Sequence, residues 1–256
     1  MKSRQLGRYY QKGVIRVAVV EINNLKKFYG TLEAVRGISF AIQKGGIFGL
    51  IGPNGAGKTT TLRVISTLLK PTSGDVKVFG YNVVTEPEKI RRLISYLPED
   101  AGAYKNLTGM GFLTFIGRFF ANGEELTKMV NKGVEIANLG DRIKDKISSY
   151  SKGMMRRLLV ARALMTGPRL AILDEPTSGL DVLNAQEVRK IIKDSVKSGV
   201  TVLLSSHNML EVEFLCDKIA LINNGVIVES GTPSELMKKY NSQNIEEVFT
   251  EVIKCS

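Results

Sequence analysis

Short apolar runs separated by turn residues predict β-strands in two parts of the chain. The run at 47–51, Ile-Phe-Gly-Leu-Ile, is apolar at every position, as is typical of a central strand covered on both faces. Further runs of this kind lie at 17–22, 38–42, 76–79 and 95–97, and then again at 170–173, 201–205, 218–222 and 226–228. Helical patterns alternate with these runs, so the sequence predicts an α/β body with a mixed sheet and helices.

Helical periodicity begins directly after the covered run and its glycine-rich turn. Apolar residues at 62, 65, 68 and 69 predict a helix that starts near Thr59 and stops at Pro71. Capping-box sequences that open with Thr85 and Thr232 predict two more helix starts. The pattern at 183–198 predicts a further helix between two strands of the second part.

Residues 106–167 show helical periodicity and no strand signal. The positions that carry it fall on two stripes, Phe112, Phe115, Ile116 and Phe119, and Met129, Val130, Val134 and Ala137. An aromatic stripe at this spacing is usually the packed face of a helix, so we expect the first stripe to be helix core. An all-helical lobe is therefore inserted into the α/β body.

These patterns divide the chain into four segments. The α/β body is expected at 17–98 and 168–230, and the helical lobe at 99–167. A basic leader at 1–16 precedes the body, and a helical segment at 231–256 follows it. The leader has no acidic residue and lacks the apolar stretch of a secretory signal, so we expect a disordered tail or an artefact of the choice of start site.

The composition of the 256 residues is close to that of soluble globular proteins, at 43% hydrophobic and 24% charged. The longest apolar runs are a handful of residues, whereas a membrane-spanning helix needs roughly 20. If a membrane matters to the function, another chain has to supply the crossing. The formal net charge of +11 favours a polyanion, an anionic membrane surface or a phosphorylated ligand, without choosing among them.

Cysteine and histidine are scarce. The chain has two cysteines, Cys216 and Cys255, which lie far apart in sequence and indicate a reducing compartment. Its single histidine, His207, argues against a structural zinc site, because such a site needs about four nitrogen or sulfur ligands.

A phosphate-binding loop is indicated between the covered strand and the helix after it. The segment is Gly52-Pro53-Asn54-Gly55-Ala56-Gly57-Lys58-Thr59. Its glycines let backbone N–H groups wrap around phosphates, and the helix start adds a positive dipole. Lys58 can reach the β and γ phosphates, and the Thr59 hydroxyl can ligate magnesium. A chance glycine-rich turn would lack this strand and helix, so we predict a P-loop NTPase body in which these residues and Thr60 bind the nucleotide.

Two carboxylates follow the apolar strand at 170–173. A doubly wound sheet binds its ligand at the carboxyl ends of the strands, so Asp174 and Glu175 are expected near the phosphate loop. Asp174 is placed to hold magnesium through water, and Glu175 can polarise an attacking water as a general base. Alone, such a pair is more often a helix cap or a solvated turn. The phosphate loop in the same chain favours the catalytic interpretation.

These motifs, together with four others in the same order, resemble the nucleotide-binding subunit of ATP-binding cassette (ABC) transporters over residues 17–230. Tyr29 matches the aromatic residue that stacks on adenine, with ordinary packing as its alternative. The segment Tyr150-Ser151-Lys152-Gly153-Met154 matches the family signature, and Ser178-Gly179-Leu180-Asp181 matches the D-loop. His207 matches the switch histidine.

The resemblance implies an ATPase with ATP and Mg²⁺ as its ligands. Glu175, His207 and Lys58 are then the catalytic residues. In the family, the signature faces the γ-phosphate bound by the opposing subunit. Ser151, Gly153 and Asp181 are therefore expected to bind ATP across a nucleotide-dependent homodimer.

The partner implied by the resemblance is a separate transmembrane permease subunit. We expect it to dock near Glu99–Leu107, because this loop joins the α/β body to the helical lobe and carries Tyr104 and Leu107 among small and polar residues. The chain is then cytoplasmic and peripheral on the inner face of the membrane. It has no direct contact with the transported substrate, and no nucleic acid is expected as a partner. The substrate itself is selected by the permease and cannot be inferred from this chain.

Two positions depart from the commonest family pattern. Glu99 stands where a glutamine usually follows the strand, although its carboxylate can still bind Mg²⁺ or accept a hydrogen bond from water. Lys152 and Met154 replace a glycine and a glutamine of the signature. With the C-terminal segment 244–249, these features resemble the branch of single-cassette subunits paired with small exporter-type membrane proteins.

Three alternatives to a transporter ATPase fit the sequence less well. A soluble nucleic-acid-associated cassette ATPase would suit the positive charge, but such proteins usually carry two cassettes or a long coiled-coil insertion. A non-catalytic nucleotide-binding scaffold would be expected to lack Glu175 or His207. A P-loop GTPase would carry an Asn-Lys-x-Asp signature, which the sequence does not contain.

Overall fold

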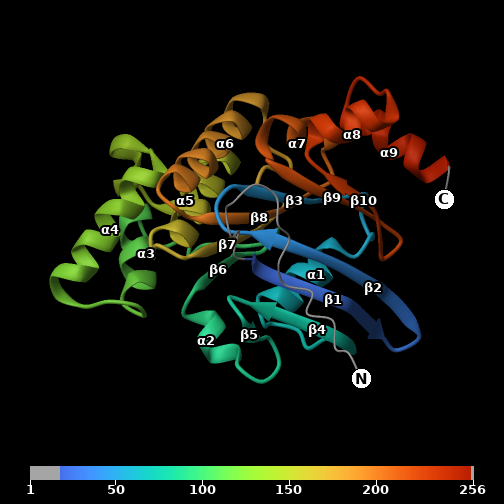
Figure 1. Ribbon diagram of the computed structural model, residues 1–256. Coiled ribbons are helices and arrows are strands. Elements are labelled where there is room, and N and C mark those ends of the chain that lie inside the picture. The colour runs from blue at the N-terminus through green and yellow to red at the C-terminus, as the bar shows by residue number, and fades with distance from the viewer. Residues whose placement is uncertain (1–17, 255–256) are drawn as a thin grey trace.

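Two β-sheets form the framework of the protein, and the computed structural model describes residues 18–254 (Figure 1). The larger sheet has the strand order β10-β9-β3-β8-β7-β6. Its neighbouring strands run parallel except β9 and β10, which are antiparallel, so the predicted mixed sheet is confirmed. Its strands are β3 (Ile47–Ile51), β6 (Ile94–Leu97), β7 (Leu170–Asp174), β8 (Thr201–Ser206), β9 (Lys218–Asn223) and β10 (Val226–Gly231). The predicted basic leader at 1–16 lies outside the described residues.

The smaller sheet is antiparallel, with the strand order β2-β1-β4-β5. Its strands are β1 (Ala18–Tyr29), β2 (Leu32–Gln43), β4 (Ser73–Val78) and β5 (Tyr81–Asn82). The strands β1 and β2 are 12 residues each and therefore longer than the apolar runs that predicted them. The added residues, 23–29 in β1 and 32–37 in β2, mix polar with apolar positions, so they give no continuous apolar run.

Helices connect the strands and cover both faces of the larger sheet. The α-helices are α1 (Lys58–Ile65), α2 (Pro87–Arg91), α3 (Gly109–Gly117), α4 (Gly123–Ala137), α5 (Lys152–Leu164), α6 (Val182–Lys197), α7 (Met209–Leu215), α8 (Pro233–Tyr240) and α9 (Ile245–Lys254). The helix α1 lies between the two sheets, and α5, α6 and α7 cover the opposite face of the larger sheet (Figure 1). Within residues 18–254, no helix combines the length and the apolar character that crossing a membrane requires.

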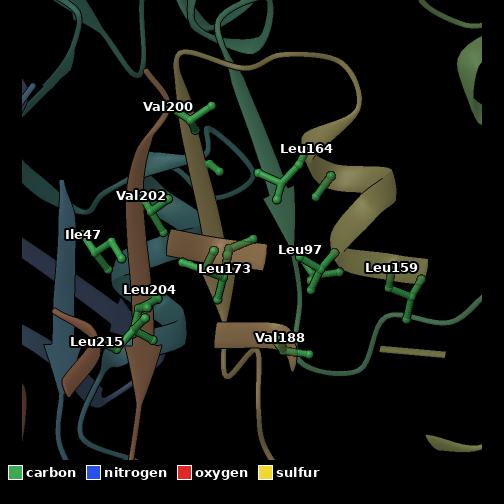
Figure 2. Close-up of a cluster of buried hydrophobic side chains, with 14 of the residues drawn as sticks. Ile47, Leu97, Leu159, Leu164, Leu173, Val188, Val200, Val202, Leu204 and Leu215 are labelled. Atoms are coloured by element: carbon green, nitrogen blue, oxygen red, sulfur yellow. The ribbon is translucent and has the colours of Figure 1, made fainter. Parts of the chain in front are cut away.

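Alternate residues of the central strands enter two different hydrophobic clusters. In β3, Ile47 and Ile51 belong to the cluster under α5 and α6, whereas Phe48 and Leu50 belong to the cluster around α1. Figure 2 shows the first cluster, with side chains of β6, β7 and β8 packed against those of α5 and α6. Because both of its faces are buried, β3 is apolar at every position.

The helices α3, α4 and α5 form the predicted helical lobe, which extends to one side of the sheets (Figure 1). The prediction that its aromatic stripe is helix core is wrong for half of the stripe. Phe112 is buried, but Phe115 is 39% exposed and Phe119 is 73% exposed. The reason is that α3 ends at Gly117 and lies at the edge of the lobe, so its partners α4 and α5 cover one face of the helix.

The helix after the phosphate loop ends earlier than predicted, at Ile65 rather than at Pro71. Thr67 adopts a left-handed conformation with φ of 63°. Its N–H donates to Val64, and the N–H of Leu68 donates to Arg63, which together form a Schellman motif. That motif usually carries glycine at the left-handed position, so a β-branched threonine gave no stop signal.

The two predicted capping boxes have different outcomes. At Thr232 the box is present: its hydroxyl accepts the Glu235 N–H, and the Glu235 carboxylate accepts the Thr232 N–H. The box predicted at Thr85 is wrong, because α2 is capped by Glu86 without a side-chain cap. The Glu86 carboxylate instead pairs with Lys89 at 2.9 Å.

Candidate functional site

The phosphate-loop segment 52–60 connects β3 to the first turn of α1, as the sequence predicts. Gly57 caps α1 with φ of 103°, and a Cβ there would lie 2.7 Å from the Ala34 carbonyl oxygen. A Cβ at Gly52 would collide with the backbone carbonyl of Ile222. The loop therefore has no room for side chains at these points. The first N–H groups of α1 have no intrahelical acceptor, so the loop and helix start can bind an anion.

Lys58 lies at the centre of this loop and is buried. Its Nζ donates to the carbonyls of Gly52 at 2.8 Å and Pro53 at 3.1 Å. The same Nζ lies 3.3 Å from Oε1 of Glu175. A buried ammonium group needs such partners, because burial without them is costly. The contact brings the end of β7 to the phosphate loop.

Asp174 ends β7 and is fully buried among hydroxyl donors. Its Oδ1 accepts hydrogen bonds from Thr59 at 3.2 Å and from Ser205 at 2.5 Å, and its Oδ2 accepts one from Tyr96 at 3.3 Å. Burial raises the pKa of the Tyr96 phenol to about 12, and the Asp174 carboxylate adds to this shift. The phenol therefore keeps its proton and remains a donor to Asp174.

Glu175 leaves the strand in a left-handed conformation, with φ of 49°. Its carboxylate is buried and bridges two groups: Oε1 faces Lys58, and Oε2 lies 2.9 Å from Nδ1 of His207. His207 follows β8 directly, so neighbouring parallel strands deliver both residues to one edge of the sheet. The predicted residues Lys58, Glu175 and His207 thus form one contiguous group.

Glu99 lies after β6 on the side of the site that faces the helical lobe. Its side chain is exposed, and Oε1 accepts a hydrogen bond from Ser178 at 3.5 Å. Its backbone carbonyl accepts a hydrogen bond from Arg156 of α5 at 2.9 Å. Glu99 therefore links the D-loop segment and α5. Binding of Mg²⁺ by its carboxylate stays a prediction.

Tyr29 lies at the end of β1 and is 44% exposed. The Lys27 ammonium lies 5.4 Å from the centre of its ring. A partly exposed aromatic ring can accept a base by stacking, which is the role that the resemblance implies for Tyr29. This role stays a prediction.

The signature and D-loop residues contact one another rather than the phosphate loop. The Ser151 hydroxyl caps α5 by accepting the Met154 N–H at 3.2 Å, and the Asp181 carboxylate caps α6 by accepting the Asn184 N–H at 2.9 Å. This backbone hydrogen bond lowers the pKa of Asp181. A Cβ at Gly153 would collide with the Asn184 side chain, so the starts of α5 and α6 are packed together.

The donors present fit a nucleotide with Mg²⁺. Within residues 18–254, no group of three or more His, Cys, Asp and Glu side chains is arranged to hold a metal ion alone. Mg²⁺ does not require one, because it is usually held by one or two carboxylates together with substrate phosphates and water. The Thr59 hydroxyl and the Asp174 carboxylate already meet beside the phosphate loop.

Comparison with known proteins identifies the family. Residues 35–178 match the family described as ABC transporter. The chain belongs to this family. It is thus an ATP-binding subunit of an ABC transporter and an ATPase.

Three curated relatives match along most of their length. The linearmycin resistance ATP-binding protein LnrL of Bacillus subtilis (strain 168) is 39% identical over 89% of this chain and 73% of the relative. The daunorubicin/doxorubicin resistance ATP-binding protein DrrA of Streptomyces peucetius is 37% identical over 87% of this chain and 68% of the relative. The bacitracin transport ATP-binding protein BcrA of Bacillus licheniformis is 36% identical over 89% of this chain and 74% of the relative.

Solved structures share the fold. The structure of an ATP-binding subunit of an ABC transporter has a TM-score of 0.80 and 27% identity, covering 92% of this chain and 99% of that one. A dimeric ATP-binding cassette in a post-hydrolysis state, bound to ADP and Pi, has a TM-score of 0.74 and 26% identity, covering 83% of this chain and 98% of that one. The α/β cassette predicted from the sequence is therefore confirmed.

Sequence reasoning missed three polar residues of this ABC ATPase that contact its site. Tyr96 and Ser205 bind Asp174 from neighbouring strands, and Arg156 binds the backbone at Glu99. A faint signal existed for the first two, because each is a polar residue in the carboxyl-terminal half of a strand that contributes to the site. No local motif indicates Arg156, whose partner is 57 residues away.

Proposed function

We propose that two copies of the chain close over two Mg-ATP molecules and power a separate transmembrane permease of the exporter type. The observation that carries this proposal is the contact of Glu175 with both Lys58 and His207. A carboxylate beside the phosphate-binding lysine is within reach of a water that attacks the γ-phosphate.

The roles of the individual residues follow from these contacts. Glu175 is the general base, Lys58 binds the β and γ phosphates, and His207 holds the Glu175 carboxylate in place. The backbone of 52–60 wraps the phosphates, and Tyr29 stacks on adenine. The proposed Mg²⁺ ligands are Thr59, Asp174 and Glu99. Bound Mg²⁺ would neutralise part of the phosphate charge.

The homodimer is supported by where the signature residues lie. Ser151 and Asp181 are exposed at the starts of α5 and α6, and their contacts are with these helices rather than with the phosphate loop. A second copy can therefore receive Ser151 and Asp181 at its own ATP. We propose the same role for Gly153, which is buried beside Asn184 in this chain. The dimeric post-hydrolysis structure of a similar cassette, with ADP and Pi, supports this arrangement.

The exporter is supported by what the relatives are named for. Two relatives are named for resistance to linearmycin and to daunorubicin and doxorubicin. Moving a toxic compound out of the cell is one way to resist it. The permease would select the compound, and this chain would act from the cytoplasmic face of the membrane without contacting it.

The loop Glu99–Leu107 and the adjoining face of α3 are the proposed docking site for the permease. Tyr104 is 57% exposed, and its ring packs edge-on against Phe115 at 5.3 Å, which in turn contacts Phe119 at 5.5 Å. Beside them is an open groove of about 600 Å³, lined by the apolar residues Leu107, Met110 and Phe115 and by Gly111, Thr108, Thr114, Arg118 and Lys144. An exposed apolar surface of this kind marks an interaction site.

Cysteine cross-linking tests the docking site in membranes that contain both subunits. In a chain with Cys255→Ser, Tyr104→Cys is expected to cross-link to the permease, since the remaining Cys216 is buried. Leu68→Cys is the matched control, because Leu68 is 62% exposed but lies on the connection between α1 and β4. Equal cross-linking at both positions, or cross-linking at Leu68 alone, would contradict the docking site.

A further inference from the structure

Ser205 is a buried hydroxyl that contacts both carboxylate residues of the site. It lies at the end of β8, directly opposite Asp174 in the parallel pairing with β7, and it is fully buried. Its hydroxyl donates to Oδ1 of Asp174 at 2.5 Å. The same oxygen accepts the backbone N–H of Glu175 at 2.9 Å. A serine hydroxyl has one proton and two lone pairs, so it can form both bonds at once.

The bond to the Glu175 N–H lies at the point where the strand pairing stops. The register between β7 and β8 ends with the pair Asp174 and Ser205, and Glu175 then turns away with φ of 49°. A non-glycine residue in this conformation is strained and needs surrounding contacts to hold it. The buried N–H of Glu175 also needs an acceptor, and Ser205 supplies it.

We propose that Ser205 is a positioning residue for ATP hydrolysis, which fixes the peptide of Glu175 so that its carboxylate stays between Lys58 and His207. The proposal rests on the general-base role of Glu175 put forward above. Ser205 touches neither nucleotide nor water in this account. It acts through the backbone of Glu175, so its loss should slow turnover more than it weakens binding of ATP.

Variants of two other hydroxyl-bearing residues test simpler explanations for a loss of turnover, namely general destabilisation and an effect through Asp174. Thr201 lies at the other end of the same strand, is equally buried, and accepts the Gly45 N–H at 2.9 Å. Removing its hydroxyl deletes a comparable buried hydrogen bond far from Glu175. Tyr96 donates to Asp174, as Ser205 does, but it has no bond to the Glu175 N–H. Removing the Tyr96 hydroxyl therefore tests the part of the effect that acts through Asp174.

The experiment measures kcat, the Kd for a fluorescent ATP analogue with Mg²⁺, and the melting temperature of four variants. Ser205→Ala is expected to lower kcat by about tenfold or more, because a small displacement of a catalytic group has effects of this size or larger. Its Kd should change by less than about threefold, since the phosphate loop is intact. Ser205→Thr keeps the hydroxyl and should recover most of kcat.

Thr201→Val should lower the melting temperature as Ser205→Ala does, with kcat within about twofold of the wild type. Tyr96→Phe should retain more kcat than Ser205→Ala.

Several results would overturn the proposal. They are a wild-type kcat in Ser205→Ala, an equal loss of kcat in Thr201→Val, or a Ser205→Thr protein that is folded but as slow as Ser205→Ala. A loss of kcat in Tyr96→Phe as large as in Ser205→Ala would assign the effect to Asp174 instead. If Ser205→Ala does not fold, Ser205→Cys is used instead in each comparison, because a cysteine side chain is closer than alanine in volume to the buried serine.

A double variant separates this proposal from the general-base assignment. If Ser205 acts through Glu175, adding Ser205→Ala to Glu175→Gln should change the residual rate by less than about twofold, because residues that act as one unit are not additive. A full multiplicative loss would contradict the positioning role while leaving the base assignment intact. Wild-type turnover in Glu175→Gln alone would instead overturn the base assignment.

Discussion

The phosphate side and the signature side of this ABC ATPase are built differently. On the phosphate side, Lys58, Asp174 and Glu175 are buried and bind each other or neighbouring hydroxyls within one chain. On the signature side, Ser151 and Asp181 are exposed, and their side chains cap their own helices. Under the proposed function, the first group is expected to bind a nucleotide within one chain. The second group has its polar atoms at a surface, where a second copy can meet them.

The largest effect is expected from Lys58→Ala, which breaks the phosphate side. The variant loses the ammonium at the centre of the loop and leaves Glu175 without its buried ion pair. Affinity for Mg-ATP should fall roughly 100-fold or more, as is typical when one member of a buried charged contact is removed. Titration with a fluorescent ATP analogue measures this.

The matched control for that titration is Lys152→Ala on the signature side. Lys152 is exposed at the start of α5, so the monomer should bind ATP with nearly wild-type affinity. Equal losses in Lys58→Ala and Lys152→Ala would contradict the separation of the two sides.

Mixing two inactive variants tests whether the phosphate side of one copy and the signature side of another form one ATP site. A Ser151→Phe chain blocks its own signature side, and a Lys58→Ala chain lacks its own phosphate side. In a mixed dimer, one ATP site combines Lys58 of the first chain with Ser151 of the second, and this site is intact. With Glu175→Gln added to both chains so that the ATP stays uncleaved, we expect an ATP-dependent mixed dimer, measured by pull-down through two different tags, whereas each chain alone should stay monomeric. A mixed dimer that does not form would contradict a site shared between two copies.

A smaller effect is expected from Glu99→Gln. Glu99 is exposed, and its carboxylate contacts Ser178 at the 3.5 Å limit of a hydrogen bond. Glutamine keeps an oxygen acceptor at this position, so ATPase activity should remain appreciable. Steady-state ATPase assays at saturating ATP measure it. Abolished turnover with unchanged ATP affinity would show that the negative charge itself is needed.

The smallest effect is expected from removal of residues 1–16. The strand β1 begins at Ala18, and the site residues named above all lie further along the chain. ATP binding and the melting temperature should therefore match those of the full chain. A loss of ATP binding that persists at high salt would show that the leader belongs to the fold.

The parts of the fold that the sequence predicts well are those specified by neighbouring residues. The phosphate loop is continuous in sequence, and the strand at 47–51, which is buried on both faces, is apolar throughout. The stop of α1 at Ile65 was missed because its left-handed residue is Thr67 rather than glycine. Exposure of Phe119 was missed because periodicity shows which residues share a helix face, but not which face is covered.

The sequence predicted the motif residues of the candidate site but not the residues from other strands that contact them. Its motif residues lie where their order in the sequence suggested, on the ends of β3, β7 and β8. The partners that hold them come from other strands: Ser205 is 31 residues from Asp174, and Tyr96 is 78 residues from it. Such contacts depend on strand order and register, which no local pattern specifies.

The central claim is that Glu175 is the base of an ATP site closed by a second copy, and Glu175→Gln tests it most directly. The amide cannot take a proton from water, yet the groups that bind ATP are unchanged. General-base catalysis contributes roughly 100- to 10,000-fold, so turnover should fall by about that factor. Uncleaved ATP should then hold two copies together by mass action, giving an ATP-dependent dimer in size-exclusion chromatography that added Lys58→Ala abolishes. A variant that hydrolyses ATP at the wild-type rate, or that is inactive but monomeric at saturating Mg-ATP, would contradict the account.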